Sequence, residues 1–108
     1  MRLALTAIEK LTVIKSRKGM YFQPTTPESA ETFLWGFRVA LGLAGAPVDR
    51  DSCRKAFEQR GWKMDSIGVI PGMRAKGLTD MQVTDELFDA FIDELHSIPN
   101  VTQGSNVA

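Results

Sequence analysis

The two side chains best suited to covalent chemistry are Cys53 and His96, the only thiol and the only imidazole in the chain. A cysteine paired with a histidine can act as a nucleophile. Cys53, however, shares an apolar helical face with Ala56 and Phe57, where a structural thiol is expected. A zinc site needs about three or four Cys, His or carboxylate ligands, and this pair makes a poor set. The sequence therefore predicts a protein that is not an enzyme and holds no metal or cofactor.

Carboxylates gather near the end of the chain, at spacings that bring them to one side of a helix. Such acids could collect a cation, but they usually form the solvated face of an amphipathic helix. We therefore expect this face to be exposed to water. The glycines of the chain fit no phosphate-binding loop. The acids concerned are Asp85, Glu86, Asp89, Asp93 and Glu94.

A second group combines cations with large aromatic side chains, mostly in and around a loop expected at residues 16–25. Aromatic residues and arginine are the types that anchor protein interfaces. The leading hypothesis is a small intracellular, non-enzymatic protein-binding or regulatory module, such as an immunity-like protein that neutralises another protein. The residues expected to contact that partner are Lys15, Arg17, Lys18, Tyr21 and Trp35.

Residues 50–76 support an alternative, a helix-turn-helix nucleic-acid-binding protein whose recognition helix would be 67–76. This stretch carries seven basic residues against three acids. The turn at 61–65 is longer than usual, and the chain has no net charge, so nucleic acid is the less favoured partner. The residues that would contact nucleic acid are Arg50, Arg54, Lys55, Arg60, Lys63, Arg74 and Lys76.

The charge of the chain is balanced overall but unevenly distributed. Residues 1–78 hold all 13 Lys and Arg and 7 of the 13 Asp and Glu, which gives +6, and residues 79–108 carry −6. Either an acidic helix face meets the basic remainder, or a dipolar surface orients a charged partner. The lone cysteine excludes an internal disulfide and fits a reducing compartment, so we expect a cytoplasmic protein.

The elements that must position these residues are all helical. Residues 27–44 begin with a good N-cap, Thr26, and end before Gly45, and Arg38 is the only charged residue among the apolar ones that follow Glu31. A helix that is apolar on nearly every side is expected at the centre of a bundle. Small residues recur every fourth position from Gly36, so we expect a neighbouring helix to cross there.

Apolar spacing predicts further helices at about 3–16, 50–60 and 79–96. Asp49 or Asp51 would cap the second of these, and Thr79 with Gln82 forms a capping box for the third. Residues 66–76 form either one helix or a broken one, because Pro71 is tolerated only near a helix start. The fold class is therefore an all-α compact bundle of four or five helices around 27–44. We expect residues 1–98 to be one helical domain, with 99–108 as a flexible C-terminal tail.

The large apolar residues also raise the question of what covers them. The apolar run at 33–48 is shorter than the roughly 20 residues that cross a membrane and contains Arg38, so no membrane association is expected. We expect Met20, Tyr21 and Phe22 to tuck under the helices. A homodimer is a credible way to cover the 27–44 helix, because symmetric pairs are the commonest oligomers.

Overall fold

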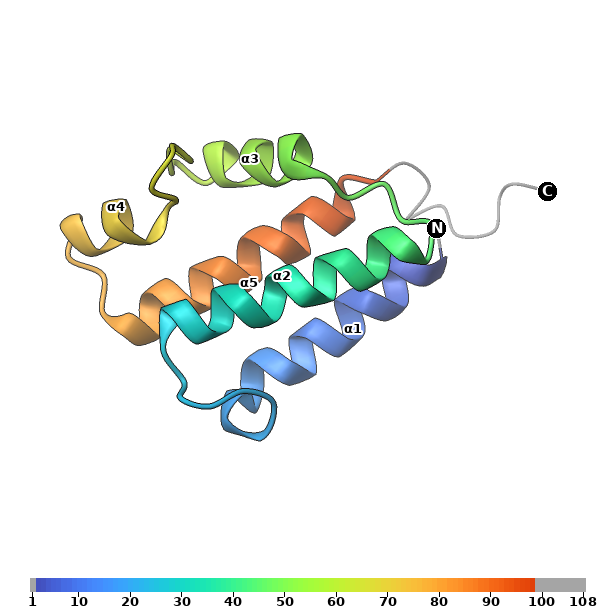
Figure 1. Cartoon of the computed structure of the whole chain (residues 1–108), viewed down its shortest axis with the longest axis horizontal. Helices are drawn as coiled ribbons and strands as arrows, with labels where there is room; N and C mark the ends of the chain where they lie inside the picture. The colour runs from blue at the N-terminus through green and yellow to red at the C-terminus, as the bar shows by residue number, and fades with distance from the viewer. Residues whose placement is uncertain (1, 99–108) are drawn as a thin grey trace.

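A computed structural model describes residues 2–98, and the expected tail at 99–108 lies outside the described residues. The described chain is a bundle of five α-helices with one 3-10 turn, η1, and no β-strand, which confirms the all-α prediction (Figure 1). The elements are α1 (Arg2–Ser16), η1 (Lys18–Met20), α2 (Pro27–Leu43), α3 (Arg50–Gln59), α4 (Ile70–Ala75) and α5 (Asp80–His96).

Three of the helices begin at caps that the sequence encodes. The Thr26 hydroxyl accepts a backbone N–H at the start of α2, and Asp49 forms a capping box with Ser52 at the start of α3. Thr79 and Gln82 form the expected capping box of α5. Each cap satisfies backbone N–H groups that have no partner within the helix, and so fixes where the helix begins.

The helix at the centre of the bundle is α5 rather than α2. α1, α2, α3 and α4 all pack against α5 (Figure 1). α5 buries eight residues, including Phe88 and Leu95, whereas α2 buries five. The bundle is thus as expected, but its central helix is α5 and not α2. The other helices enclose α5 from several sides, so only a strip of its carboxylates faces outward.

One side of α2 is uncovered within the described chain. Trp35, Val39 and Leu43 are 54%, 49% and 86% exposed. A Cβ added at Gly36 would meet nothing within 4 Å, so the prediction that a neighbouring helix crosses there is wrong for residues 2–98. Apolar composition all round a helix does not say which sides its own chain covers. In this part of the chain no helix is both long and apolar enough to cross a membrane.

A chain of aromatic rings fastens α2 to α5. Phe22 lies between Phe33 and Phe88, with ring centroids 5.5 Å and 6.1 Å away. Phe37 lies 6.2 Å from Phe33 and meets Phe91 edge-on at 6.0 Å. Phe33 and Phe37 are half-buried and pack against the core, as a role in the bundle requires. Such offset and edge-to-face pairs add stabilisation beyond the area that they bury.

The apolar spacing of residues 3–16 predicts a core stripe of Leu5, Ile8, Leu11 and Ile14, but the N-terminal helix uses smaller residues for part of its core face. α1 buries Ala4, Ala7, Leu11 and Ile14, whereas Leu5 is 36% exposed. Alanine at the contact lets α1 lie close against α5, so the buried stripe is one residue away from the predicted one at this end.

The loop after α1 also differs in part from expectation. Phe22 tucks under the helices, but Met20 and Tyr21 are 74% and 45% exposed and lie outside them. Within residues 66–76, only the segment from Ile70 to Ala75 is helical, with Pro71 in its first turn. The question of one helix or a broken one is thus answered by a short helix preceded by a turn.

The exposure of Gly36 yields a prediction about stability. Gly36→Ala should raise the free energy of unfolding by about 1 kcal/mol, because alanine favours the helix and its methyl group meets no neighbour. Urea unfolding of dilute protein, followed by circular dichroism, measures the change. The control, Gly45→Ala, should destabilise, because Gly45 has a φ of +98°. A destabilised Gly36→Ala variant would mean that this side of α2 is covered after all.

Candidate functional site

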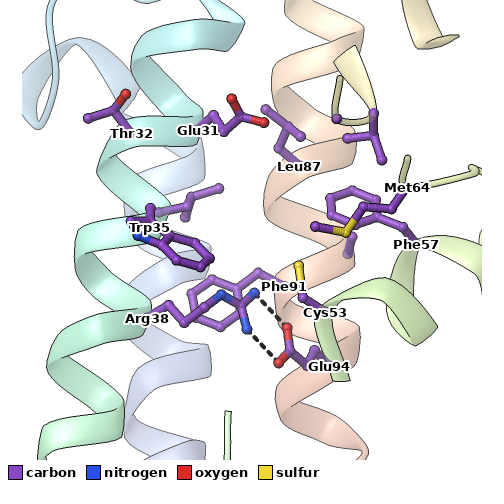
Figure 2. Close-up of a pocket in the computed structure, with 14 residues that line it drawn as sticks. Glu31, Thr32, Trp35, Arg38, Cys53, Phe57, Met64, Leu87, Phe91 and Glu94 are labelled. Carbon is purple, nitrogen blue, oxygen red and sulfur yellow. Dashed lines mark hydrogen bonds and ion pairs between the residues drawn. The ribbon is translucent and has the colours of Figure 1, made fainter. Parts of the chain in front are cut away.

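A pocket opens between α2 and α3, each of which packs against α5 rather than against the other. Its volume is about 340 Å³. α2 and α3 form the walls, the segment between α3 and α4 closes one end, and α5 forms the floor (Figure 2). We call this pocket the α2–α3 groove. Its main apolar lining residues are Leu34, Trp35, Phe57, Met64, Ala90 and Phe91.

The polar part of the α2–α3 groove is a buried ion pair. The guanidinium of Arg38 donates to both carboxylate oxygens of Glu94, each at 2.6 Å (Figure 2). The Ser52 hydroxyl donates to Glu94 at 2.5 Å, and the Arg38 guanidinium lies 4.5 Å from the centre of the Phe91 ring. The Arg38 and Glu94 side chains are only 10% and 1% exposed. The expectation that Glu94 lies on the solvated face is therefore wrong.

This ion pair connects three helices at one point. Arg38 comes from α2, Glu94 from α5 and Ser52 from the first turn of α3. A two-bond arginine–carboxylate pair has a fixed geometry, so it sets how α2 lies on α5 beside the groove. Removing one partner would leave the other charged and buried, which costs far more than the intact pair contributes.

Two other titratable groups line the groove. Burial raises the pKa of the Cys53 thiol, so the neutral thiol is favoured and the side chain is a weak nucleophile. At the rim, partial burial raises the pKa of the Glu31 carboxyl, and the nearby charge of Glu28 adds to the effect. Glu31 takes part in none of the ion pairs found within residues 2–98.

The acidic strip of α5 is matched by basic residues from elsewhere in the chain. Lys15 bonds Asp89 and Lys18 lies beside Asp85, each at 2.7 Å. Arg60 lies 2.7 Å from Glu86 and also reaches Asp93, and these contacts raise its pKa. Internal pairing of an acidic helix face with the basic remainder therefore accounts for much of the uneven charge.

The residues expected to contact a protein partner fall into two places. Lys15, Arg17 and Lys18 line a shallow depression with Met20 beside them, and the exposed Tyr21 follows directly in the loop. Lys15 and Lys18 both form ion pairs with carboxylates of α5. Trp35 lies elsewhere, in the wall of the α2–α3 groove (Figure 2). The structure thus brings the loop residues together and separates Trp35 from them.

The residues expected to contact nucleic acid do not form a helix-turn-helix. Residues 60–69 separate α3 from α4, and α4 has only six residues. Of the predicted cations, Arg54 and Lys55 pair with Asp51.

Of the remaining cations expected to contact nucleic acid, two form ion pairs within the described chain and three do not. Arg74 bonds Glu28 at 2.5 Å and Asp80 at 3.2 Å, and Arg60 is held by α5. Between residues 50 and 76, the exposed cations that form no ion pair with a described residue are Arg50, Lys63 and Lys76.

Sequence reasoning missed the Arg38–Glu94 pair although one signal for it was present. A lone charge in an otherwise apolar helix that packs in a core requires a buried counter-charge. Arg38 is such a charge, and the strip of acids on α5 offered several partners. The choice of Glu94 depends on how the two helices lie together, which residue spacing within either helix does not specify.

No protein-family model, curated protein or solved structure matches this chain. Among the described residues, no group of three His, Cys, Asp or Glu side chains could hold a metal ion. The α2–α3 groove therefore remains the candidate functional site on its own geometry: an apolar pocket with a few fixed polar groups, which is the usual composition of a ligand site.

The buried ion pair leads to a second prediction. Glu94→Gln should lower the free energy of unfolding by about 3–5 kcal/mol, because Arg38 loses its counter-charge while it stays buried. Urea unfolding measures the loss. The neighbouring variant Asp93→Asn should cost about 1 kcal/mol or less, since the Asp93 side chain is 45% exposed. Equal effects of the two substitutions would contradict the burial of the pair.

Proposed function

We propose that this protein is a non-enzymatic binding module whose α2–α3 groove receives apolar side chains from an amphipathic helix of a partner protein. The observation that carries the proposal is the apolar pocket of about 340 Å³ with Trp35 half-exposed in its wall. Pockets that bind ligands usually fall between roughly 300 and 1,000 Å³. A groove between two helices is a common way to bind a third helix.

The lining of the groove favours a protein partner. Large aromatic side chains dominate the energetics of protein interfaces. Trp35 offers such a surface, while Phe57 and Phe91 supply further apolar wall and floor. Leucine or phenylalanine side chains spaced three or four positions apart on a partner helix would reach this surface together.

The charge at the rim narrows the chemistry of the partner. Glu31 has no cation beside it among the described residues, and its raised pKa reflects a carboxylate that is poorly stabilised. A lysine or arginine on the partner would stabilise its ionised form. We therefore infer an amphipathic helix that carries large apolar residues and a basic residue next to them.

A module of this kind would act by sequestering the helix that it binds. The groove offers no activated nucleophile, since burial keeps the pKa of the Cys53 thiol raised. Masking a helix that the partner needs elsewhere would inhibit or regulate that partner, as in the neutralising role expected from the sequence. We propose a reducing compartment such as the cytoplasm, which fits a chain whose single cysteine cannot form an internal disulfide.

The nucleic-acid alternative has weaker support. Four of its seven expected contact residues form ion pairs within the chain. Affinity for nucleic acid depends on basic side chains that are available to replace counterions along the phosphates. The three remaining cations come from α3, the loop after it and the end of α4, and they supply only a small basic surface.

Selection of displayed helical peptides on the purified protein tests the proposed function. Enriched sequences should carry Leu, Phe or Trp at positions i and i+4, with a flanking Lys or Arg. Ala90→Leu, which fills the groove floor, should weaken the selected peptide at least tenfold, and Trp35→Ala should weaken it similarly. Ala75→Leu, which adds the same atoms at an exposed site, should not.

Several outcomes would overturn this function. The selection could enrich no helical peptide, or it could enrich peptides with acidic rather than basic flanks. The enriched peptides could also bind Ala90→Leu and Trp35→Ala with the same affinity as the parent. If an apolar small molecule binds the groove while helical peptides do not, the ligand is a metabolite rather than a protein.

The raised pKa of Glu31 adds a pH prediction. Binding of a cationic peptide needs ionised Glu31, so affinity should be full at neutral pH. It should fall as the pH drops through the raised pKa, which lies above the ordinary 4.5. Fluorescence titrations at several pH values measure this change. Glu31→Gln should bind more weakly at neutral pH and lose the pH dependence, whereas Glu9→Gln on α1 should behave like the parent. A parent-like profile for Glu31→Gln would exclude Glu31 as the contact.

A further inference from the structure

The exposed side of α2 forms an apolar surface separate from most of the groove. Leu43, at 86%, is the most exposed large apolar residue of this side, and Trp35 and Val39 are each about half-exposed. Arg38, the only charged residue between Thr32 and Val48, turns inward to Glu94, so no charge interrupts the surface. Continuous apolar surface on a small protein is commonly an interaction site. We call it the α2 outer face.

The α2 outer face has a regular order of large and small residues. Three adjacent pairs, each a large residue followed by a small one, recur every four positions, so that they lie along one side of the helix. All six residues are exposed. They are Trp35 and Gly36, Val39 and Ala40, and Leu43 and Ala44.

We propose that the α2 outer face binds the same face of a second copy, with the two α2 helices antiparallel about a two-fold axis that passes between Val39 and Ala40. In that register each large residue meets a small one. Leu43 of one copy lies over Gly36 of the other, Trp35 meets Ala44, and Val39 meets Ala40. Small residues allow the backbones to approach closely, and the large ones fill the remaining space.

The order of residues favours a second copy over an unrelated partner. A two-fold interface uses one surface twice, so that surface must be complementary to itself. In the antiparallel pair the two α2 helices run in opposite directions. Each large residue of one copy therefore lies opposite a small residue of the other. The chain also carries no net charge, so two copies do not repel one another as a whole.

Contacts within the described chain do not explain why position 36 is a glycine. Glycine within a helix costs about 1 kcal/mol relative to alanine, and within the described chain a Cβ at Gly36 meets nothing within 4 Å. Close contact with Leu43 of a second copy gives this glycine a structural role. The interface overlaps the groove only at Trp35, since Gly36, Val39 and Leu43 do not line the groove.

The expected affinity follows from the size of the surface. α2 has 17 residues and is therefore about 25 Å long. A contact between single helices falls among small interfaces, below roughly 1,200 Å² in total, and these are typically weak. We therefore expect a dimer with a dissociation constant in the micromolar range, on the order of 1–100 µM.

Sedimentation equilibrium from about 1 µM to 1 mM tests the dimer, since the range brackets the expected dissociation constant. The parent chain should shift from monomer to dimer across this range. Leu43→Glu and Gly36→Leu should each raise the dissociation constant at least tenfold, and both should stay folded by circular dichroism because both sites are exposed. Met81→Glu, at an exposed methionine on α5, should leave it unchanged.

A swapped variant tests the register. Gly36→Leu combined with Leu43→Ala again places a large residue opposite a small one, and it should recover the dimer to within about tenfold of the parent, as coupled contacts do. A parent chain that stays monomeric throughout, a dimer unaffected by Leu43→Glu, or a swap without recovery would overturn the proposal. Peptide binding by Gly36→Leu should remain, so failure of the dimer is distinguishable from failure of the groove.

Discussion

The buried Arg38–Glu94 ion pair is the interaction on which the rest of this structure depends. It joins α2 to α5 through two short hydrogen bonds, and Ser52 adds α3 to the same point. The desolvated charges must stay paired, so the three helices have one favourable arrangement there. That arrangement places the α2–α3 groove above the pair. It also turns the only charge in the apolar part of α2 inward, which leaves the α2 outer face without charge.

The two proposed surfaces therefore share an origin but differ in chemistry. The groove combines apolar walls and floor with the buried ion pair and the carboxylate of Glu31 at its rim, which suits a helix with basic residues. The α2 outer face has only apolar and small residues and suits its own copy. Trp35 lies where the two surfaces meet, in the groove wall and half-exposed.

The sequence predicted what is local. The starts of α2 and α5 follow from the caps predicted at Thr26 and Thr79, and Asp49 is one of the two caps predicted for α3. Apolar spacing predicted the all-α fold. The sequence did not predict which sides of a helix are covered. α2 is apolar nearly all round, and the acids of α5 are either buried, as Glu94 is, or paired with basic residues from other elements. Arg38 and Glu94 are 56 positions apart, so their contact depends on tertiary packing alone. The groove is likewise a product of packing, since its walls come from helices that meet only through α5.

A double-mutant cycle on the ion pair is the most direct test of this account. Unfolding free energies are measured for the parent, Arg38→Met, Glu94→Leu and the double variant. Each single change should cost several kcal/mol, because it strands a buried charge. The double variant should cost much less than their sum, with a coupling energy of about 2–3 kcal/mol or more. Additive effects would show that the two side chains do not meet in a buried site, and would contradict the arrangement from which both surfaces were inferred.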